Sequence, residues 1–238
     1  MRPFVSHPSP NHEDRRGESI DMLVLHYTGM ESAAAALARL CDPAAKVSAH
    51  YLIDEDGTVC ALVSEERRAW HAGLSRWRGQ ADVNSRSIGI ELVNPGHEFG
   101  YRAFPDAQID ALIELAQRLL GRHPIPARNV VGHSDVAPAR KQDPGELFPW
   151  PRLKAYGIGL WPFSGEERVE WLPQETLRRL AGYGYDVSDP VAAVAAFQRH
   201  FRPHLINGVN DAETAGRLER LLGTLRPGSA PVVSYEGW

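Results

Sequence analysis

VVGHSDVAPARKQDPG, at residues 130–145, combines a short apolar segment, a histidine and a polar loop broken by proline. The apolar segment predicts a buried strand that ends at His133, and Lys141 and Asp143 follow two positions apart. Side chains two residues apart in an extended segment point to the same side. A histidine, a cation and a carboxylate are therefore expected together at the carboxyl end of a strand, where α/β folds often carry their chemistry.

A second stretch, LVLHYTG at residues 23–29, also ends an apolar run with a histidine, His26. Two imidazoles and the Asp143 carboxylate would hold a tetrahedral zinc ion with one open position, the pattern of catalytic rather than structural zinc sites. The alternative is that His26, His133 and Asp143 are ordinary polar residues at strand ends. The matching positions of the two histidines favour the metal site, and we predict these three residues as zinc ligands.

Three further residues are candidates for work beside this metal. Glu91 lies inside the apolar run SIGIELVN, where a carboxylate is costly unless it has a purpose. Burial would raise its pKa toward the range in which a general base works near neutral pH, although alternation alone leaves open an exposed position on a half-buried strand. Lys141 would place a positive charge where an oxyanion develops, unless it is a solvated loop lysine. Asp135 is a candidate for orienting the loop.

Strands and helices alternate around these residues. The predicted strands are residues 20–28, a hairpin at 48–64, 87–96 and 129–134. The predicted helices are residues 31–42, 106–123 and 148–157. Interleaved strands and helices indicate an α/β fold, a mixed central β-sheet flanked by helices, over residues 20–158. Residues 65–85 have no clean period and are expected to form a long loop.

The two ends of the chain depart from this pattern. Residues 1–19 are rich in proline, serine, histidine and charge, and they are expected to form an irregular N-terminal arm. After a linker at residues 157–167, three helical stripes predict a small C-terminal three-helix domain at residues 168–225. A core of this size is marginal for independent folding, so we expect the domain to lean on the larger one.

Composition and charge exclude several classes of protein. The 238 residues carry a net charge of −4 without a basic run, which argues against nucleic acid as a partner. No segment approaches the ~20 apolar residues that span a bilayer, so no membrane contact is expected. The chain as given starts without an export signal, which predicts a cytoplasmic protein, with a periplasmic one as the alternative. Cys41 and Cys60 match no metal motif and are interpreted as small buried apolar residues, and the oligomeric state is left open.

Five segments follow one another in the order found in a known family: LVLHYTG, SAHYLIDEDGTV, AWHAG, SIGIELVNPG and GHSDVAPARKQDPG. They cover most of residues 20–158. With them, the chain resembles the zinc-dependent N-acetylmuramoyl-L-alanine amidases of the AmpD/AmiD type, the amidase 2 family, which also includes the peptidoglycan recognition proteins. The segment VAAVAAFQRHFRPHLINGVNDAETAGRLERLL resembles the three-helix peptidoglycan-binding module of the AmiD branch.

The resemblance implies a role for each candidate residue. It makes Zn²⁺ the cofactor of the three predicted ligands, Glu91 the catalytic acid and base, and Lys141 the group that polarises the amide carbonyl. Trp70, His71 and Arg140 are then expected to contact the muramyl group or the stem peptide.

The implied reaction is hydrolysis of the amide bond between N-acetylmuramic acid, or its 1,6-anhydro form, and L-alanine in peptidoglycan or muropeptides. We expect it to serve the recycling of soluble anhydro-muropeptides, with action on intact peptidoglycan at the wall as the alternative. Two other functions stay open: a non-catalytic peptidoglycan-binding protein, which the complete ligand set disfavours, and a different zinc hydrolase. The absence of an HExxH helix disfavours the latter.

Overall fold

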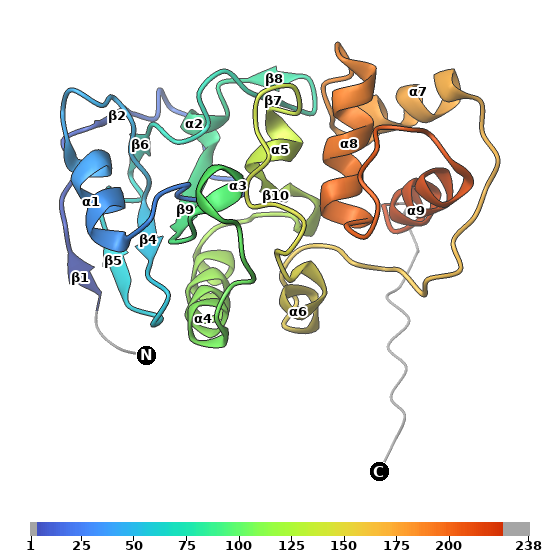
Figure 1. Ribbon diagram of the computed structural model, residues 1–238. Helices are drawn as coiled ribbons and strands as arrows, with labels where there is room; N and C mark the ends of the chain where they lie inside the picture. Colours follow the sequence, from blue (N-terminus) through green and yellow to red (C-terminus); the bar gives the residue numbers. More distant parts are fainter. Residues whose placement is uncertain (1–3, 226–238) are drawn as a thin grey trace.

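Two neighbouring six-residue strands, β3 (Met22–Tyr27) and β9 (Ser87–Leu92), form the middle of the central sheet in the computed structural model, which describes residues 4–225 (Figure 1). The four flanking strands are shorter: β10 (Val130–Gly132), β4 (Tyr51–Ile53), β5 (Val59–Ala61) and β1 (Val5–Ser6). The order is β1-β5-β4-β9-β3-β10. β4, β9, β3 and β10 run parallel, β5 is antiparallel to β4, and β1 is parallel to β5. The predicted mixed sheet is confirmed.

One face of the sheet is covered by α4 (Asp106–Arg122) and α6 (Trp150–Ala155), which lie side by side at the bottom of Figure 1. Apolar side chains at helical spacing on α4 meet the strand side chains that point to this face. Those from the helix are Ile109, Leu112, Ile113, Leu115, Ala116 and Leu119, and those from the two central strands are Leu23, Leu25, Ile88, Ile90 and Leu92. This layer forms the largest part of the core.

The opposite face is covered near β4 and β5 by α1 (Ala33–Cys41). Leu40 of this helix packs in one cluster with Leu52 and Cys60. Both cysteines are free; Cys60 is buried as expected, whereas Cys41 is partly exposed. A cleft lies beside α1 on this face, bordered by the carboxyl ends of β3 and β9.

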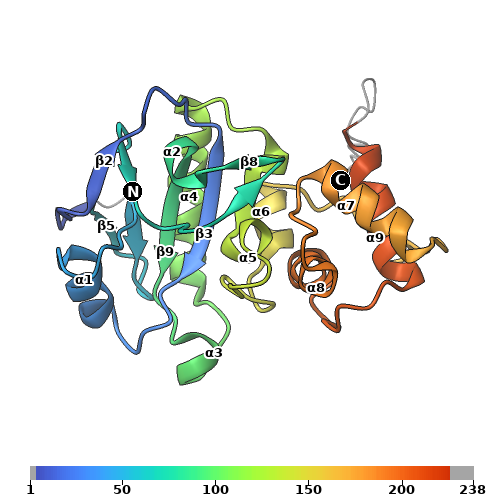
Figure 2. The same ribbon diagram turned by 90° about the horizontal axis from the view of Figure 1, so that it is seen from above.

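The three predicted C-terminal helices are confirmed as α7 (Pro173–Tyr183), α8 (Pro190–Phe201) and α9 (Ala212–Gly223). The carboxylates of Asp189 and Asp211 precede α8 and α9 and accept backbone hydrogen bonds from their first turns. Figure 2 shows the three helices on one side of the molecule, beside α6.

These helices share a core with the sheet. Met22 and Val24 of β3 and Val131 of β10 belong to the same buried apolar cluster as Phe197 of α8 and Leu218 of α9. The C-terminal helices therefore pack against the larger unit, as the small size of their own core predicts.

The described part of the N-terminal arm, residues 4–19, is less irregular than expected, because it contains two short strands. β1 extends the central sheet, and β2 (His12–Asp14) pairs with β6 (Arg67–Ala69) in an antiparallel ribbon. The polar side chains that suggested a surface arm are used inward. Ser9 donates to a carbonyl of α1, and the Asn11 amide donates to two carbonyls that follow α1. These polar side chains thus satisfy backbone groups of the protein, and the two strands are too short to show a period in the sequence.

The expectation of one long loop at residues 65–85 is also wrong. Besides β6, the segment contains the hairpin of β7 (Arg76–Trp77) and β8 (Gln80–Ala81) and the short helix α2 (Val83–Arg86). Strands of two or three residues are too short to show a period of two in sequence. The other short elements are α3 (Gly96–Phe99), the 3-10 turn η1 (Ala127–Asn129) and α5 (His133–Val136).

Replacing Phe197 with alanine tests the shared core. Truncation of a buried phenylalanine costs about 3–5 kcal/mol, and the loss should lower the stability of the whole chain in a single unfolding transition. The check is thermal unfolding followed by circular dichroism and tryptophan fluorescence. The control is Val191→Ala in the same helix, since Val191 is 63% exposed. Two separate transitions, with only one shifted by Phe197→Ala, would contradict the shared core.

Candidate metal centre

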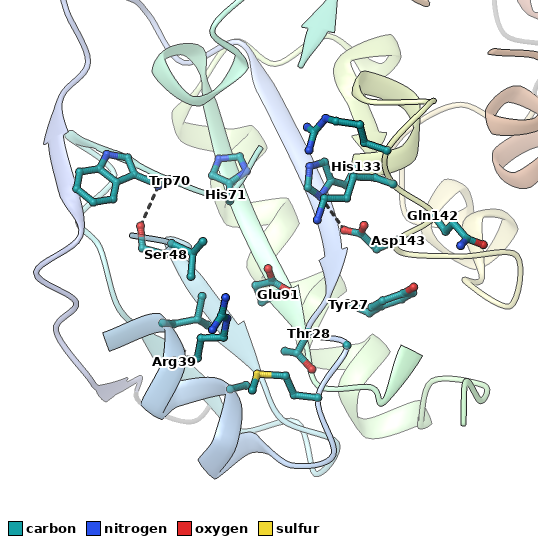
Figure 3. A pocket seen from close by; sticks show the side chains of 17 residues that line it. Tyr27, Thr28, Arg39, Ser48, Trp70, His71, Glu91, His133, Gln142 and Asp143 are labelled. Carbon is teal, nitrogen blue, oxygen red and sulfur yellow. Dashed lines mark hydrogen bonds and ion pairs between the residues drawn. The ribbon is translucent and has the colours of Figure 1, made fainter. Parts of the chain in front are cut away.

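His26 and Glu91 are neighbours because β3 and β9 pair in parallel register, which places their Cα atoms opposite each other. Along the strands they alternate with Leu25, Ile90 and Leu92, which point into the core beneath α4. Both polar side chains therefore point to the other face, toward the cleft. Figure 3 shows the Glu91 carboxylate at the cleft, and the residue is partly exposed there.

The three predicted ligands meet at one point. His26 Nδ1, His133 Nδ1 and Asp143 Oδ2 lie 3.0 Å from one another in all three pairings. Ligand atoms about 2.0–2.1 Å from a tetrahedral zinc ion would be about 3.3 Å apart, so a small shift outward accommodates a metal. All three residues are buried, and they form a group able to hold a metal ion within residues 4–225.

The charge states of these side chains also fit a metal. Burial, reinforced by the neighbouring His133, lowers the pKa of His26 to about 4. Burial alone would raise the pKa of Asp143, but the attraction of His133 and the close contacts with both histidines outweigh it and hold that pKa well below its usual range. Near pH 7 His26 is therefore neutral and Asp143 ionised, the states in which imidazole and carboxylate bind metals.

The segment that carries two of the ligands folds back on itself. His133 begins α5 instead of ending β10, and the backbone N–H of the next residue, Ser134, donates to the carbonyl of Asp143 at 2.9 Å. Lys141 and Gln142 have no regular secondary structure, and Asp143 begins a turn. The backbone contact between Ser134 and Asp143 closes the loop and brings the two predicted ligands together.

Lys141 nevertheless lies where the sequence predicted. Its side chain lines the cleft together with Glu91, His133 and Asp143. Its positive charge acts to lower the pKa of His26 and of Glu91, which places it near both groups.

Asp135 hydrogen-bonds to the backbone next to the loop that carries His133 and Asp143, here called the metal loop (residues 133–143). Its carboxylate is fully buried, and Oδ2 accepts hydrogen bonds from the Gly132 backbone N–H at 2.7 Å and from His200 Nδ1 at 2.7 Å. Oδ1 accepts from the Tyr185 hydroxyl at 2.6 Å. Gly132 directly precedes the ligand His133, while Tyr185 and His200 belong to the C-terminal helical region. The orienting role considered for Asp135 from sequence therefore has a structural basis, and it links that region to the metal site.

Glu91 is placed to exchange protons. Burial and the nearby Asp143 carboxylate raise the pKa of Glu91 well above its ordinary value, while Lys141 opposes the shift. Its Oε2 atom is buried without a hydrogen-bond partner among the described residues. Such a carboxylate is held for a group that the protein itself does not supply, such as a substrate proton or a water molecule.

The cleft has a volume of about 390 Å³ and is lined by the three residues predicted to contact substrate, Trp70, His71 and Arg140. The Arg140 guanidinium donates to the carbonyls of Ala72 and Leu74, so it also fixes one wall. His71 uses both ring nitrogens within the protein, toward His26 and toward Ser87. Figure 3 shows Trp70 on the side of the cleft away from His133 and Asp143.

Arg39 and Tyr27 are among the lining residues that the sequence did not single out. Arg39 comes from the last turn of α1 and reaches the cleft in Figure 3. Tyr27 follows His26 directly, at the end of β3. An arginine in the last turn of a helix is commonly explained by the helix dipole, so the sequence gave no reason to single it out.

Asp135→Asn should loosen the metal loop. The amide nitrogen of the variant would face a group that now donates a hydrogen bond to the carboxylate. The lost hydrogen bond should lower the free energy of unfolding by about 1–3 kcal/mol. We expect a lower melting temperature and weaker metal binding, measured by thermal unfolding with and without metal. Asp110→Asn is the control, since Asp110 pairs with Arg152 at an exposed site. Equal melting temperatures and metal affinities in both variants would remove the role of Asp135.

The chain matches the family model described as N-acetylmuramoyl-L-alanine amidase over residues 16–146. It is 43% identical over 230 residues to the N-acetylmuramoyl-L-alanine amidase AmiD of Escherichia coli (strain K12), covering 85% of this chain and 82% of that relative. It is 37% identical over 166 residues to the 1,6-anhydro-N-acetylmuramyl-L-alanine amidase AmpD of Enterobacter cloacae, covering 62% of this chain and 87% of the relative.

A solved structure agrees with these relatives. The complex of AmiD from E. coli with the substrate anhydro-N-acetylmuramic acid-L-Ala-D-gamma-Glu-L-Lys superposes with a TM-score of 0.79 at 40% identity. The match covers 91% of this chain and 92% of that structure, so it extends beyond the sheet into the C-terminal helices. The shared fold, the sequence identity and the convergence of His26, His133 and Asp143 together lead to one assignment: this chain belongs to the N-acetylmuramoyl-L-alanine amidase family of hydrolases.

Proposed function

We propose that this protein is a zinc-dependent amidase that hydrolyses the bond between N-acetylmuramic acid, or its 1,6-anhydro form, and L-alanine. One observation carries the proposal: three buried ligand atoms converge at 3.0 Å spacing beside a cleft that also presents Glu91 and Lys141. Two histidines and one carboxylate leave a fourth position open, as in catalytic zinc sites. A non-catalytic binding protein would have no use for this complete set.

We assign the steps of the reaction to two side chains. When bound, zinc supplies a Lewis acid that polarises the scissile carbonyl and makes water nucleophilic near pH 7. Glu91 accepts the proton of the attacking water and returns it to the leaving amine of L-alanine, for which its raised pKa is suited. Lys141 donates to the oxyanion that develops on the carbonyl oxygen.

The substrate class follows from the relatives and from the charge of the cleft. The AmiD complex contains as substrate an anhydro-muramyl peptide with a γ-linked glutamate. The AmpD relative is called a 1,6-anhydro-N-acetylmuramyl-L-alanine amidase. A γ-linked glutamate keeps its α-carboxylate free. Arg39, Arg140 and Lys141 line the cleft and supply positive charge for such an anion, although the whole chain carries −4. We therefore propose that muropeptides and anhydro-muropeptides are the substrates of this chain.

We propose the following division of the chain. Residues 20–158 form the catalytic unit, with residues 1–19 as an N-terminal arm; β1 of this arm adds an edge strand to the central sheet, and β2 pairs with β6 in a separate ribbon. Residues 168–225 form a helical unit of the peptidoglycan-binding type. Several large apolar side chains on that unit are exposed, namely Leu172, Val191, Leu205 and Val209, which suits contact with a glycan or peptide.

We further propose that the protein acts in the cytoplasm on soluble recycled fragments, with a periplasmic enzyme acting on intact peptidoglycan as the alternative. The anhydro-sugar in the names of its relatives supports soluble fragments. Within residues 4–225, the helices are too short or too polar to cross a bilayer. Fractionation of cells that express the full gene tests the compartment.

Glu91→Gln should remove turnover but keep the metal. Loss of a general acid and base typically reduces kcat by about 10²–10⁴-fold, whereas zinc content should stay near that of the unchanged protein because Glu91 is not a proposed ligand. Peptide release and bound zinc are measured on the same samples. Unchanged kcat would take Glu91 out of the reaction, and lost zinc would make it part of the metal site.

The pH dependence of the stability of Glu91→Gln tests the raised pKa of Glu91. In the metal-free protein the pKa of Glu91 is raised by folding, so its ionisation opposes folding as the pH rises above the ordinary value of 4.5. Glu91→Gln should therefore be more stable than the unchanged protein at pH 7, and this difference should shrink toward pH 4. A variant that is less stable at pH 7 would contradict burial as the cause of the shift.

The two candidate substrates separate the two physiological roles. Purified full-length chain should release L-alanyl peptides from soluble anhydro-muropeptides with a kcat/KM about tenfold or more above that for solubilised peptidoglycan strands. Digestion is followed by chromatography of released peptides, with zinc-depleted protein as the blank. Faster release from intact sacculi would support the wall-side alternative, and no release from any substrate with zinc bound would support a binding protein.

A further inference from the structure

His71 and Ala72 are consecutive residues of the AWHAG segment, and each contacts one of the proposed metal-binding histidines. His71 Nδ1 lies 3.0 Å from His26 Nε2, and the Ala72 carbonyl oxygen lies 3.1 Å from His133 Nε2. In both histidines the contacted nitrogen is the one outside the converging ligand atoms. Two consecutive residues, one through its ring and the other through its backbone carbonyl, therefore contact the outer nitrogens of both rings.

The contact with Ala72 fixes where His133 carries its proton. A neutral imidazole has one N–H and one lone pair, and a carbonyl oxygen can only accept. For this contact to be a hydrogen bond, Nε2 of His133 must carry the hydrogen and donate it to Ala72. This leaves the lone pair on Nδ1, so the 3.0 Å approach of Nδ1 to Asp143 Oδ2 is a contact between two proposed metal ligands and not a hydrogen bond.

A longer chain of hydrogen bonds fixes the proton of His26 in the same way. The Ser87 hydroxyl lies 2.7 Å from the carbonyl oxygen of Val83 and must donate its only hydrogen there. Ser87 Oγ therefore accepts from His71 Nε2, at 3.1 Å. With its hydrogen on Nε2, His71 presents a bare Nδ1, which accepts from His26 Nε2. The lone pair of His26 is again left on Nδ1.

The surroundings of His71 hold it in this arrangement. The side-chain oxygen of Asn84 accepts hydrogen bonds from the backbone N–H groups of both His71 and Ala72, at 3.1 and 2.8 Å. The His71 ring also packs on Gly89 of β9: a Cβ atom at position 89 would lie 2.4 Å from the ring. His71 is 8% exposed, so the ring is largely withdrawn from solvent. These contacts are those of a fixed structural element more than of an adaptable substrate contact.

We propose that His71 is a positioning residue, which with the Ala72 carbonyl selects the tautomer of both metal-binding histidines and so presents both Nδ1 lone pairs to the metal. This rests on the metal site of the proposed function, and it replaces the substrate contact that the family resemblance implied for His71. Such outer contacts to metal-bound imidazoles typically contribute 10–100-fold to metal affinity.

Metal affinity separates positioning from packing. His71→Ala should weaken zinc binding about 10–100-fold, measured by competition with a chromophoric chelator. His71→Asn should recover much of that loss, because its amide oxygen can accept from His26 in place of Nδ1. His50→Ala is the matched control: His50 is also fully buried, with its ring 5.8 Å from His71, but its hydrogen bonds go to Arg15, Arg67 and Gly89. It should lose stability yet keep zinc affinity.

The tautomers can be read without metal or turnover. In metal-free protein labelled with ¹⁵N-histidine, two-bond ¹H–¹⁵N correlation spectra at pH 7 should show the proton of His26 and His133 on Nε2. Ser87→Ala, a smaller change that keeps His71, should give a mixture of tautomers at His26 and leave His133 unaltered. This variant keeps the test available if His71→Ala does not fold.

Two outcomes would overturn the proposal. One is an unaltered His26 tautomer in both Ser87→Ala and His71→Ala; the other is equal loss of zinc affinity in His71→Ala, His71→Asn and His50→Ala, which would indicate packing alone. Failure of the proposed function is distinct from both. It would appear as an unchanged protein that binds no zinc, or binds it without cleaving muropeptides, while showing the expected tautomers.

Discussion

The parallel pairing of β3 with β9 is the constraint on which the site depends. It sets His26 opposite Glu91 and turns both away from the α4 core. A slip of one residue along β9 would turn Glu91 into that core and bring Ile90 or Leu92 to the cleft, because strand side chains alternate between faces. The apolar residues of β9 that fill the core therefore also fix the position of the Glu91 carboxylate. Core and site are specified by the same alternation.

The metal loop depends on a second constraint, the buried carboxylate of Asp135. A fully buried carboxylate is unfavourable unless donors surround it, and Asp135 accepts from the backbone before His133 and from Tyr185 and His200. Two of these donors come from beyond the catalytic unit. The C-terminal region thus contributes to the scaffold of the metal loop, whatever it binds at its own surface.

Sequence predicted the regular parts of this protein and the three side chains that converge at the candidate metal centre. Long apolar periods identified β3, β9, α4 and the C-terminal helices, and two histidines after apolar runs identified His26 and His133. The short pairings of the N-terminal arm and of residues 65–85 escaped prediction because two or three residues carry no period. Contacts such as His71 with His26, 45 positions apart, and Asp135 with His200, 65 apart, arise only once the chain is folded. Spacing in sequence does not encode them.

One signal was nevertheless present in SIGIEL. Ser87, Gly89 and Glu91 share a face of β9, and this alternation suits a solvent-exposed face as well as a site. Glycine distinguishes the two, because it weakens a strand by about 0.5–1 kcal/mol relative to alanine and an exposed face gains nothing from it. Its presence at position 89 indicates close approach by another group, here the His71 ring. All three positions on this face therefore contribute to the cleft: the Ser87 hydroxyl contacts the His71 ring, Gly89 leaves room for that ring, and the Glu91 carboxylate lines the cleft beside it.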